Sequence, residues 1–186
     1  MPVFFYIIYG IWGVSEVILN RVLRSGKEDR PASGKHTLTY IWVTIIISII
    51  ISSNIGERTS FPMLKWSLTG YAGIALLVGG MIFRFIAIAS LGRFFTVDVA
   101  IRKDHVLKKD GLYKYIRHPA YTGSLLSFLG FGISFNNWVA LVVVMIPVTA
   151  AFLYRIKVEE ELLMQQFGHE YAEYRKSTYR LVPGVY

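Results

Sequence analysis

The residues best suited to chemistry are Arg117, His118 and Pro119, which stand directly before an apolar segment. That segment, residues 120–154, holds no Asp, Glu, Lys or Arg. Charged and polar residues at the edge of so apolar a segment are costly to desolvate, and they usually serve a function. Proline fits the first turn of a helix, where its missing N–H is not needed. A helix that begins at Pro119 would therefore present free backbone donors beside Arg117 and His118.

Two tyrosines flank this motif and can add ring faces and hydroxyl groups to it, Tyr113 before it and Tyr121 after it. The residues alone leave two interpretations of equal weight. In one, a basic and aromatic belt meets lipid headgroups at the membrane surface. In the other, the motif binds a polar ligand beside the N-terminus of the helix.

A second polar cluster follows the apolar segment, with Arg155 and then three consecutive glutamates, Glu159, Glu160 and Glu161. Arg155 and Glu159 are spaced i, i+4 and share one helix face. They form either a simple ion pair or a site in which Arg155 orients an anionic group and Glu159 faces a cationic or hydrogen-bonding ligand. We expect Glu160 and Glu161 to point elsewhere and to be solvated.

The elements that must position these clusters are membrane helices. Hydrophobic residues make up 54% of the 186 residues and charged residues only 17%, which is too apolar for an ordinary soluble domain. The pattern predicts an all-α integral membrane protein of one domain. About five transmembrane helices are expected, at residues 3–22, 38–54, 67–91, 119–134 and 138–156, the last continuing as a polar helix to about residue 166.

Two local features refine this prediction. Residues 3–19 could be a signal peptide, but no basic region precedes them and no small-residue cleavage site follows, which favours a first transmembrane helix. Asn136 and Asn137 predict a tight turn, so the fourth and fifth helices should form a hairpin.

Basic residues predict the orientation of the chain in the membrane. Lysine and arginine gather in the loops 21–37 and 92–118 and in the tail after residue 154, whereas the turn at 136–137 has none. The positive-inside rule then places the N-terminus outside and the C-terminus in the cytoplasm. The membrane would be the inner membrane of a bacterium or the endoplasmic reticulum of a eukaryote. Topology also accounts for the net charge of +8, and no nucleic-acid partner is expected.

Glu16 and Arg84 are charged residues inside apolar segments. Because an intramembrane charge usually has a partner, we predict that these two side chains pair and that the pair serves structure rather than catalysis.

Several chemistries are not indicated by the sequence. The absence of cysteine excludes disulfides and cysteine nucleophiles. The four histidines show no metal-ligand spacing, so no metal is expected. There is no nucleotide-binding glycine motif and no serine nucleophile elbow.

The C-terminal half resembles a known family over roughly residues 90–186. The matching pattern is His105-x-Leu107-x-x-x-Gly111-x-Tyr113-x-x-x-Arg117-His118-Pro119-x-Tyr121-x-Gly123, then Arg155-x-x-x-Glu159-Glu160, then Phe167-Gly168-x-Glu170-Tyr171-x-x-Tyr174. It is similar to that of the isoprenylcysteine carboxyl methyltransferase family, and the related phospholipid N-methyltransferases share much of it.

The resemblance implies S-adenosylmethionine as cofactor. It assigns cofactor contacts to two groups of residues and to Glu159: His105, Val106, Leu107 and Lys108 in the first, and Tyr113, His118, Pro119, Ala120 and Tyr121 in the second. It assigns Arg155 to the methyl acceptor, so Arg155 and Glu159 are the expected catalytic pair. Residues 1–91 would form a three-helix part. Residues 92–186 would carry the cytoplasmic cofactor pocket, formed by the loop after the third helix, the hairpin and the tail.

Three functions follow, in order of preference. The first is carboxyl methylation of an isoprenylcysteine-like or other lipidic acceptor, because Arg155 suits an anionic group. The second is N-methylation of a phospholipid amine, in which Glu159 or Glu160 would help to remove a proton. The third is a sterol reductase-like activity with a nicotinamide cofactor. Expected partners are a lipidic or prenylated acceptor and membrane lipids, and no obligate protein partner is inferred.

Overall fold

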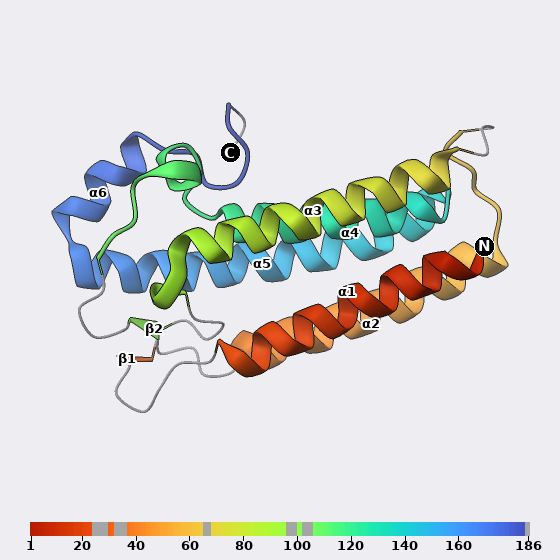
Figure 1. Ribbon diagram of the computed structural model, residues 1–186, viewed down its shortest axis with the longest axis horizontal. Helices are drawn as coiled ribbons and strands as arrows, with labels where there is room; N and C mark the ends of the chain where they lie inside the picture. The colour runs from red at the N-terminus through yellow and green to blue at the C-terminus, as the bar shows by residue number, and fades with distance from the viewer. Residues whose placement is uncertain (24–29, 32–36, 65–67, 96–99, 102–105, 185–186) are drawn as a thin grey trace.

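The protein is almost entirely helical, as Figure 1 shows. The computed structural model describes residues 1–23, 30–31, 37–64, 68–95, 100–101 and 106–184. The helices are α1 (Val3–Val22), α2 (Thr37–Arg58), α3 (Thr69–Leu91), α4 (Pro119–Ser134), α5 (Trp138–Phe167) and α6 (His169–Lys176), with short 3₁₀ turns η1 (Gly92–Phe94) and η2 (Gly111–Lys114). The strands β1 (Arg30–Pro31) and β2 (Ala100–Ile101) form a two-residue antiparallel ladder. The predicted all-α class is confirmed.

Among the described residues, four helices are long and apolar enough to cross a membrane, namely α1, α2, α3 and α5. The fifth predicted span, α4, has 16 residues and is about 24 Å long, so it is shorter than a typical apolar core of about 30 Å. The 30 residues of α5 reach about 45 Å. Its C-terminal part therefore extends beyond the apolar core, as the sequence predicted.

Close packing of α3 against α4 fixes the position of the Arg117–Pro119 motif. A Cβ atom added at Gly123 would come within 2.6 Å of the Arg84 backbone nitrogen, and one added at Gly80 within 2.5 Å of the Ser127 nitrogen. Small residues let two helix backbones approach this closely in membranes. The N-terminal turns of α4 are thereby held against the C-terminal part of α3.

The turn between α4 and α5 is the predicted hairpin. Asn137 caps α5 by accepting hydrogen bonds from the backbone nitrogens of Val139 and Ala140 at 3.0 and 3.1 Å, which satisfies donors that the helix itself leaves unpaired. Asn136 adopts a φ of 47°, a left-handed conformation that asparagine tolerates. Tyr121 and Arg155 are thus brought level on neighbouring antiparallel helices.

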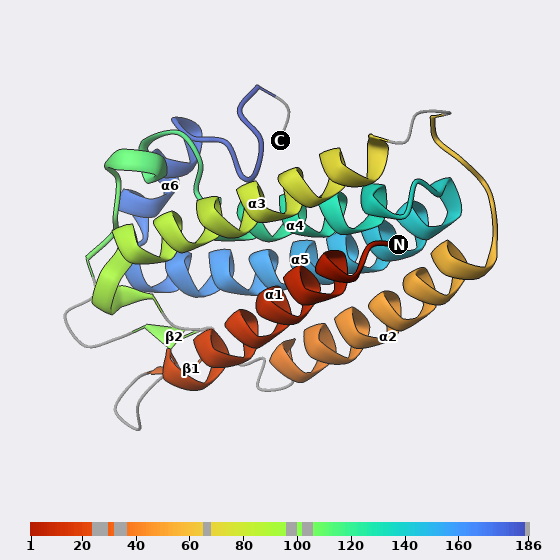
Figure 2. The ribbon, with the colours of Figure 1, turned by 45° about the vertical axis from the view of Figure 1, so that its right-hand side comes forward.

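The C-terminal tail folds back onto the segment that precedes α4. Arg117 donates its backbone N–H to the Tyr179 carbonyl at 2.8 Å, and Tyr179 donates to the Tyr115 carbonyl at 3.0 Å. Figure 2 shows α6 and the segment around η2 at the same end of the helix bundle. Residues from the two ends of the C-terminal half therefore enclose one region.

Candidate functional site

A cavity of about 210 Å³ lies at this end of the bundle and is lined by residues of all six described helices, of which α6 contributes two tyrosines. Its lining includes Asn20 near the end of α1 and Tyr174 near the end of α6. The division into parts 1–91 and 92–186 stays a prediction, and the cavity draws on both.

The cavity has two chemically different ends. Polar and charged side chains gather at the first end, and this end is lined by Lys108, Tyr113, His118, Tyr121, Arg155, Glu159, Tyr171 and Tyr174. The second end is an apolar arm between α1, α2, α4 and α5, and it is lined by Trp12, Ile41, Ile45, Ile49, Phe128 and Phe152. A molecule with a polar head and a hydrocarbon chain matches this division.

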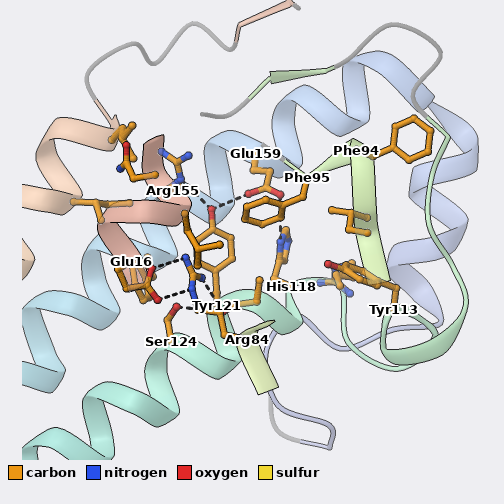
Figure 3. Close-up of a pocket in the computed structure, with 18 of the residues that line it drawn as sticks. Glu16, Arg84, Phe94, Phe95, Tyr113, His118, Tyr121, Ser124, Arg155 and Glu159 are labelled. Carbon is orange, nitrogen blue, oxygen red and sulfur yellow. Dashed lines mark hydrogen bonds and ion pairs between the residues drawn. The ribbon is translucent and has the colours of Figure 1, made fainter. Parts of the chain in front are cut away.

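The Tyr121 hydroxyl links Arg155 to Glu159 at the junction of the two ends. Arg155 Nε donates to the Tyr121 oxygen at 3.0 Å, and the Tyr121 hydroxyl donates to Glu159 Oε2 at 2.9 Å (Figure 3). Arg155 also donates from Nη1 to Thr37 Oγ1 at 3.2 Å. Arg155 and Glu159, which lie i, i+4 on α5 as the sequence predicted, are therefore bridged by the Tyr121 side chain of α4.

His118 lies between two carboxylates and is only 4% exposed. Its Nδ1 is 3.8 Å from Glu159 Oε1, and its Nε2 is 3.3 Å from Glu160 Oε1. A buried histidine that is hydrogen-bonded to Glu160 through Nε2 and lies near Glu159 through Nδ1 is suited to orienting these carboxylates, and it is poorly placed to act as a free base.

Glu160 contradicts the prediction that it would be solvated. Its side chain is buried, and it accepts hydrogen bonds from Arg117 Nε at 3.1 Å and from Arg180 Nη2 at 2.8 Å. The prediction was wrong because α6 and the tail fold over this face of α5, and a helix-face argument does not include such returning segments. Glu161 is exposed, as predicted.

Tyr113, Tyr171 and Tyr174 close the polar end from beyond the membrane helices. Burial raises the pKa of each of these three hydroxyl groups above its usual value, so they stay protonated and can donate hydrogen bonds. Tyr174 donates to the Tyr113 carbonyl at 2.6 Å. The buried Tyr171 hydroxyl has no hydrogen-bond partner among the described residues. An unpaired buried hydroxyl in a cavity wall is available to a polar ligand.

The predicted pair of Glu16 and Arg84 is confirmed. Arg84 Nε lies 2.8 Å from Glu16 Oε1, and Arg84 Nη2 donates to Glu16 Oε2 at 3.0 Å. Arg84 Nη1 also donates to the Ala120 carbonyl at 3.1 Å. Both charged side chains line the cavity, so the pair joins α1, α3 and α4 directly beside the site (Figure 3).

The structure brings most of the predicted site residues together. Those that line the cavity are Leu107, Lys108, Tyr113, His118, Ala120, Tyr121, Arg155 and Glu159. Two do not belong to the described lining: Val106, which is 64% exposed, and Pro119, which is buried at the start of α4. His105 lies outside the described residues.

Sequence reasoning missed several residues of the cavity as site residues. Tyr171 and Tyr174 line the polar end, and they were present in the matched pattern without an assigned role. Phe94 and Phe95 also line the cavity, directly after α3 (Figure 3). Their neighbouring aromatic rings at a helix end were the only available signal.

A cavity that joins a charged end to an apolar arm, within a helical protein that has four candidate membrane spans among its described residues, places the chain in the class of integral membrane proteins with an intramembrane site suited to amphipathic molecules. The sequence model of the isoprenylcysteine carboxyl methyltransferase (ICMT) family matches residues 73–165. The chain belongs to this family and is a membrane methyltransferase.

Individual relatives are consistent with this assignment. The chain is 32% identical to protein-S-isoprenylcysteine O-methyltransferase B of Arabidopsis thaliana, over 94% of this chain and 83% of that protein. It is 34% identical to protein-S-isoprenylcysteine O-methyltransferase of Dictyostelium discoideum, over 68% of this chain and 54% of that protein.

A solved structure shares the fold. The eukaryotic intramembrane Ras methyltransferase ICMT, without a monobody, superimposes with a TM-score of 0.58 at 24% identity, over 79% of this chain and 52% of that chain. The present chain thus spans about half the length of that protein.

Proposed function

We propose that this protein transfers a methyl group from S-adenosylmethionine to the carboxylate of an isoprenylcysteine-like lipidic acceptor. The observation that carries the proposal is the position of Arg155, a buried cation where the polar end of the cavity meets the apolar arm. A carboxylate attached close to a hydrocarbon chain would reach Arg155 when the chain occupies the arm.

The polar end has groups that fit the methyl donor. Glu159 presents a carboxylate that is 32% exposed, and the rings of Tyr113 and Tyr121 stand beside it in the lining. A carboxylate and aromatic ring faces stabilise a sulfonium cation. The unpaired Tyr171 hydroxyl would serve the polar atoms of the adenosine or amino-acid portions.

When bound, S-adenosylmethionine supplies an electrophilic methyl group, whose bond to sulfur breaks with its electron pair left on sulfur as an acceptor oxygen forms the new C–O bond. An ionised carboxylate has no proton to lose, so no general base is required. Arg155 would hold the acceptor carboxylate by charge-assisted hydrogen bonds. The Tyr121 bridge would fix Arg155 relative to Glu159. The aromatic side chains in the lining would help to exclude water from the reacting groups.

Two features favour carboxyl methylation over amine methylation. Methylation of a phospholipid amine requires a proton acceptor. His118 and Glu160 are engaged with each other at 3.3 Å, and Glu159 accepts a hydrogen bond from Tyr121 at 2.9 Å and is proposed to face the sulfonium. The relatives are named as O-methyltransferases, which supports the same choice.

We further propose that the polar end of the cavity faces the cytoplasm, with the N-terminus outside. The positive-inside rule supports this orientation. The methyl donor would then enter from the cytoplasm, and the acceptor would enter sideways from the bilayer.

The test is a methyl-transfer assay with purified protein, labelled S-adenosylmethionine and an N-acetylated S-farnesylcysteine. We expect label in the acceptor that is released by mild alkali, because methyl esters hydrolyse and N-methyl amines do not. The exposed Glu161→Gln variant is the active control, and Arg155→Ala should lose most turnover. Alkali-stable label, or binding of a reduced nicotinamide in place of S-adenosylmethionine, would contradict the proposal.

A further inference from the structure

We propose that two adjacent residues of α1, Trp12 and Gly13, set the length of the isoprenyl chain that the apolar arm accepts. This inference rests on the proposed function and adds to it a residue-level determinant of acceptor choice.

A series of aromatic side chains marks the course of the arm away from the polar end. The ring of Tyr121 lies 5.4 Å from that of Phe152, and Phe152 lies 6.1 Å from Phe128. Phe128 in turn meets the indole of Trp12 edge-on at 4.9 Å. All four residues line the cavity, so the series leads from the Arg155–Tyr121 pair to α1.

Beyond Trp12 the same series continues into closed core. Phe131 lies 5.9 Å from Trp12 and 5.0 Å from Tyr9. Phe131 is 2% exposed and Trp12 is 5% exposed, and both belong to the main apolar core cluster. Trp12 therefore forms the floor of the arm, with the packed core directly behind it.

The length of the arm can be followed along α2. Thr37 is hydrogen-bonded to Arg155 and marks the level of the acceptor carboxylate. Ile41, Ile45 and Ile49 line the cavity at successive turns from there. Ile49 is about 18 Å along the helix axis from Thr37. An arm of this length suits an extended prenyl chain, and its floor limits how many isoprene units can enter.

Gly13 supplies unoccupied space in the wall of the same arm. Gly13 lines the cavity, and apart from its own helix no described atom lies within 4 Å of a Cβ added there. A side chain at this position would begin in open space at the cavity wall, so it has room to extend toward the arm. Gly10 provides a matched control, because a Cβ there is equally unobstructed but Gly10 is not part of the described cavity lining.

The experiment compares acceptors that differ by one isoprene unit, N-acetylated S-farnesylcysteine and S-geranylgeranylcysteine, in the full-length protein. The readout is the ratio of kcat/KM for the longer acceptor to that for the shorter one. Gly13→Leu should lower this ratio by about tenfold, because small changes in an apolar pocket discriminate to that degree. Gly10→Leu should leave it unchanged. Trp12→Leu, which shortens the floor side chain, should raise it.

The outcomes separate this inference from the function on which it rests. If wild type methylates neither acceptor, the proposed function fails. If wild type methylates an acceptor but Gly13→Leu and Gly10→Leu give the same ratio, the inference is overturned. Should Trp12→Leu fail to fold, the Gly13 and Gly10 pair decides alone, since leucine is favoured over glycine within a helix. Equal loss of both acceptors in Gly13→Leu would likewise refute a role in chain length.

Discussion

Glu160 of α5 and Arg180 of the C-terminal tail are joined by two hydrogen bonds, from Nε to Oε1 at 3.2 Å and from Nη2 to Oε2 at 2.8 Å. Arg117 and His118 approach the same carboxylate from the start of α4. One buried carboxylate thus fastens three segments that are distant in sequence. Part of the Arg117–Pro119 motif therefore serves to hold the tail over the site.

Replacing Glu160 with glutamine should loosen the tail. The change leaves Arg117 and Arg180 without their shared anionic partner, and removal of one member of a buried ion pair is strongly destabilising. We expect a loss of about 3 kcal/mol in the free energy of unfolding, the lower end of the range for a broken buried ion pair because glutamine can still accept hydrogen bonds. We also expect faster proteolysis after residue 176. Glu161→Gln is the matched control, because Glu161 is exposed. Equal stability of the two variants would contradict the role assigned to Glu160.

Replacing Tyr121 with phenylalanine should show whether its hydroxyl positions Arg155 and Glu159 for catalysis or contributes to binding of the cofactor. The hydroxyl that bridges Arg155 and Glu159 is lost, while the ring in the cavity wall remains. We expect kcat to fall by about 10- to 100-fold, because small errors in alignment are costly to transfer reactions. Affinity for S-adenosylmethionine, measured by calorimetry, should change little. Tyr154→Phe removes the hydroxyl of an exposed α5 residue, and it should change neither kcat nor cofactor affinity. A large loss of cofactor affinity in Tyr121→Phe would refute the bridge as a positioning device.

Truncation of Arg155 or of Glu159 to alanine should impair different functions, acceptor turnover in the first case and cofactor binding in the second. Arg155→Ala removes the proposed acceptor-binding cation, so acceptor turnover should fall by more than about tenfold while the cofactor still binds. Glu159→Ala removes the carboxylate proposed to face the sulfonium, so the dissociation constant of S-adenosylmethionine should rise. Calorimetry and initial-rate assays distinguish the two effects. If both variants bind the cofactor like wild type, the assignment of Glu159 is wrong.

Much of the fold was predictable because the spacing of charges along the chain reveals membrane helices. The predicted span 3–22 coincides with α1, and 119–134 coincides with α4. The Glu16–Arg84 pair was predictable for the same reason, since each intramembrane charge needs a partner. These inferences use only local pattern and the cost of burying charge.

The misassignment of Glu160 had a different origin. Its burial depends on Arg180 returning across α5, and no periodicity in the sequence specifies where a short polar tail docks. The role of Tyr121 as a bridge was also hidden, because it depends on the register between α4 and α5. Contacts that depend on tertiary register between polar segments are the part that sequence patterns do not determine.

The Glu16–Arg84 pair should behave as one unit in a double-mutant cycle. Side-chain exposure is low for both, at 22% for Glu16 and 14% for Arg84, so each single change leaves a poorly solvated charge. We expect Glu16→Gln and Arg84→Met to be individually destabilising and the double variant to be less so than their sum. The coupling should be about 1–3 kcal/mol, read from unfolding in detergent. Additive effects would show that the two side chains do not depend on each other.

Helix packing between α3 and α4 should tolerate no side chain at Gly130. A Cβ added there would overlap backbone atoms of Leu77 and Gly73 on α3, so the helices would have to separate. Gly130→Ala should lower the free energy of unfolding by about 1–3 kcal/mol, the usual cost of overpacking. It should also lower the rate of methyl transfer, because α4 carries Tyr121.

Gly79→Ala is the control for Gly130→Ala. No described atom outside its own helix lies within 4 Å of the added Cβ, and alanine is a better helix former than glycine. That variant should be as stable as wild type or more so. Comparable stability of the two variants in thermal unfolding would mean that the close α3–α4 approach does not hold α4 in place.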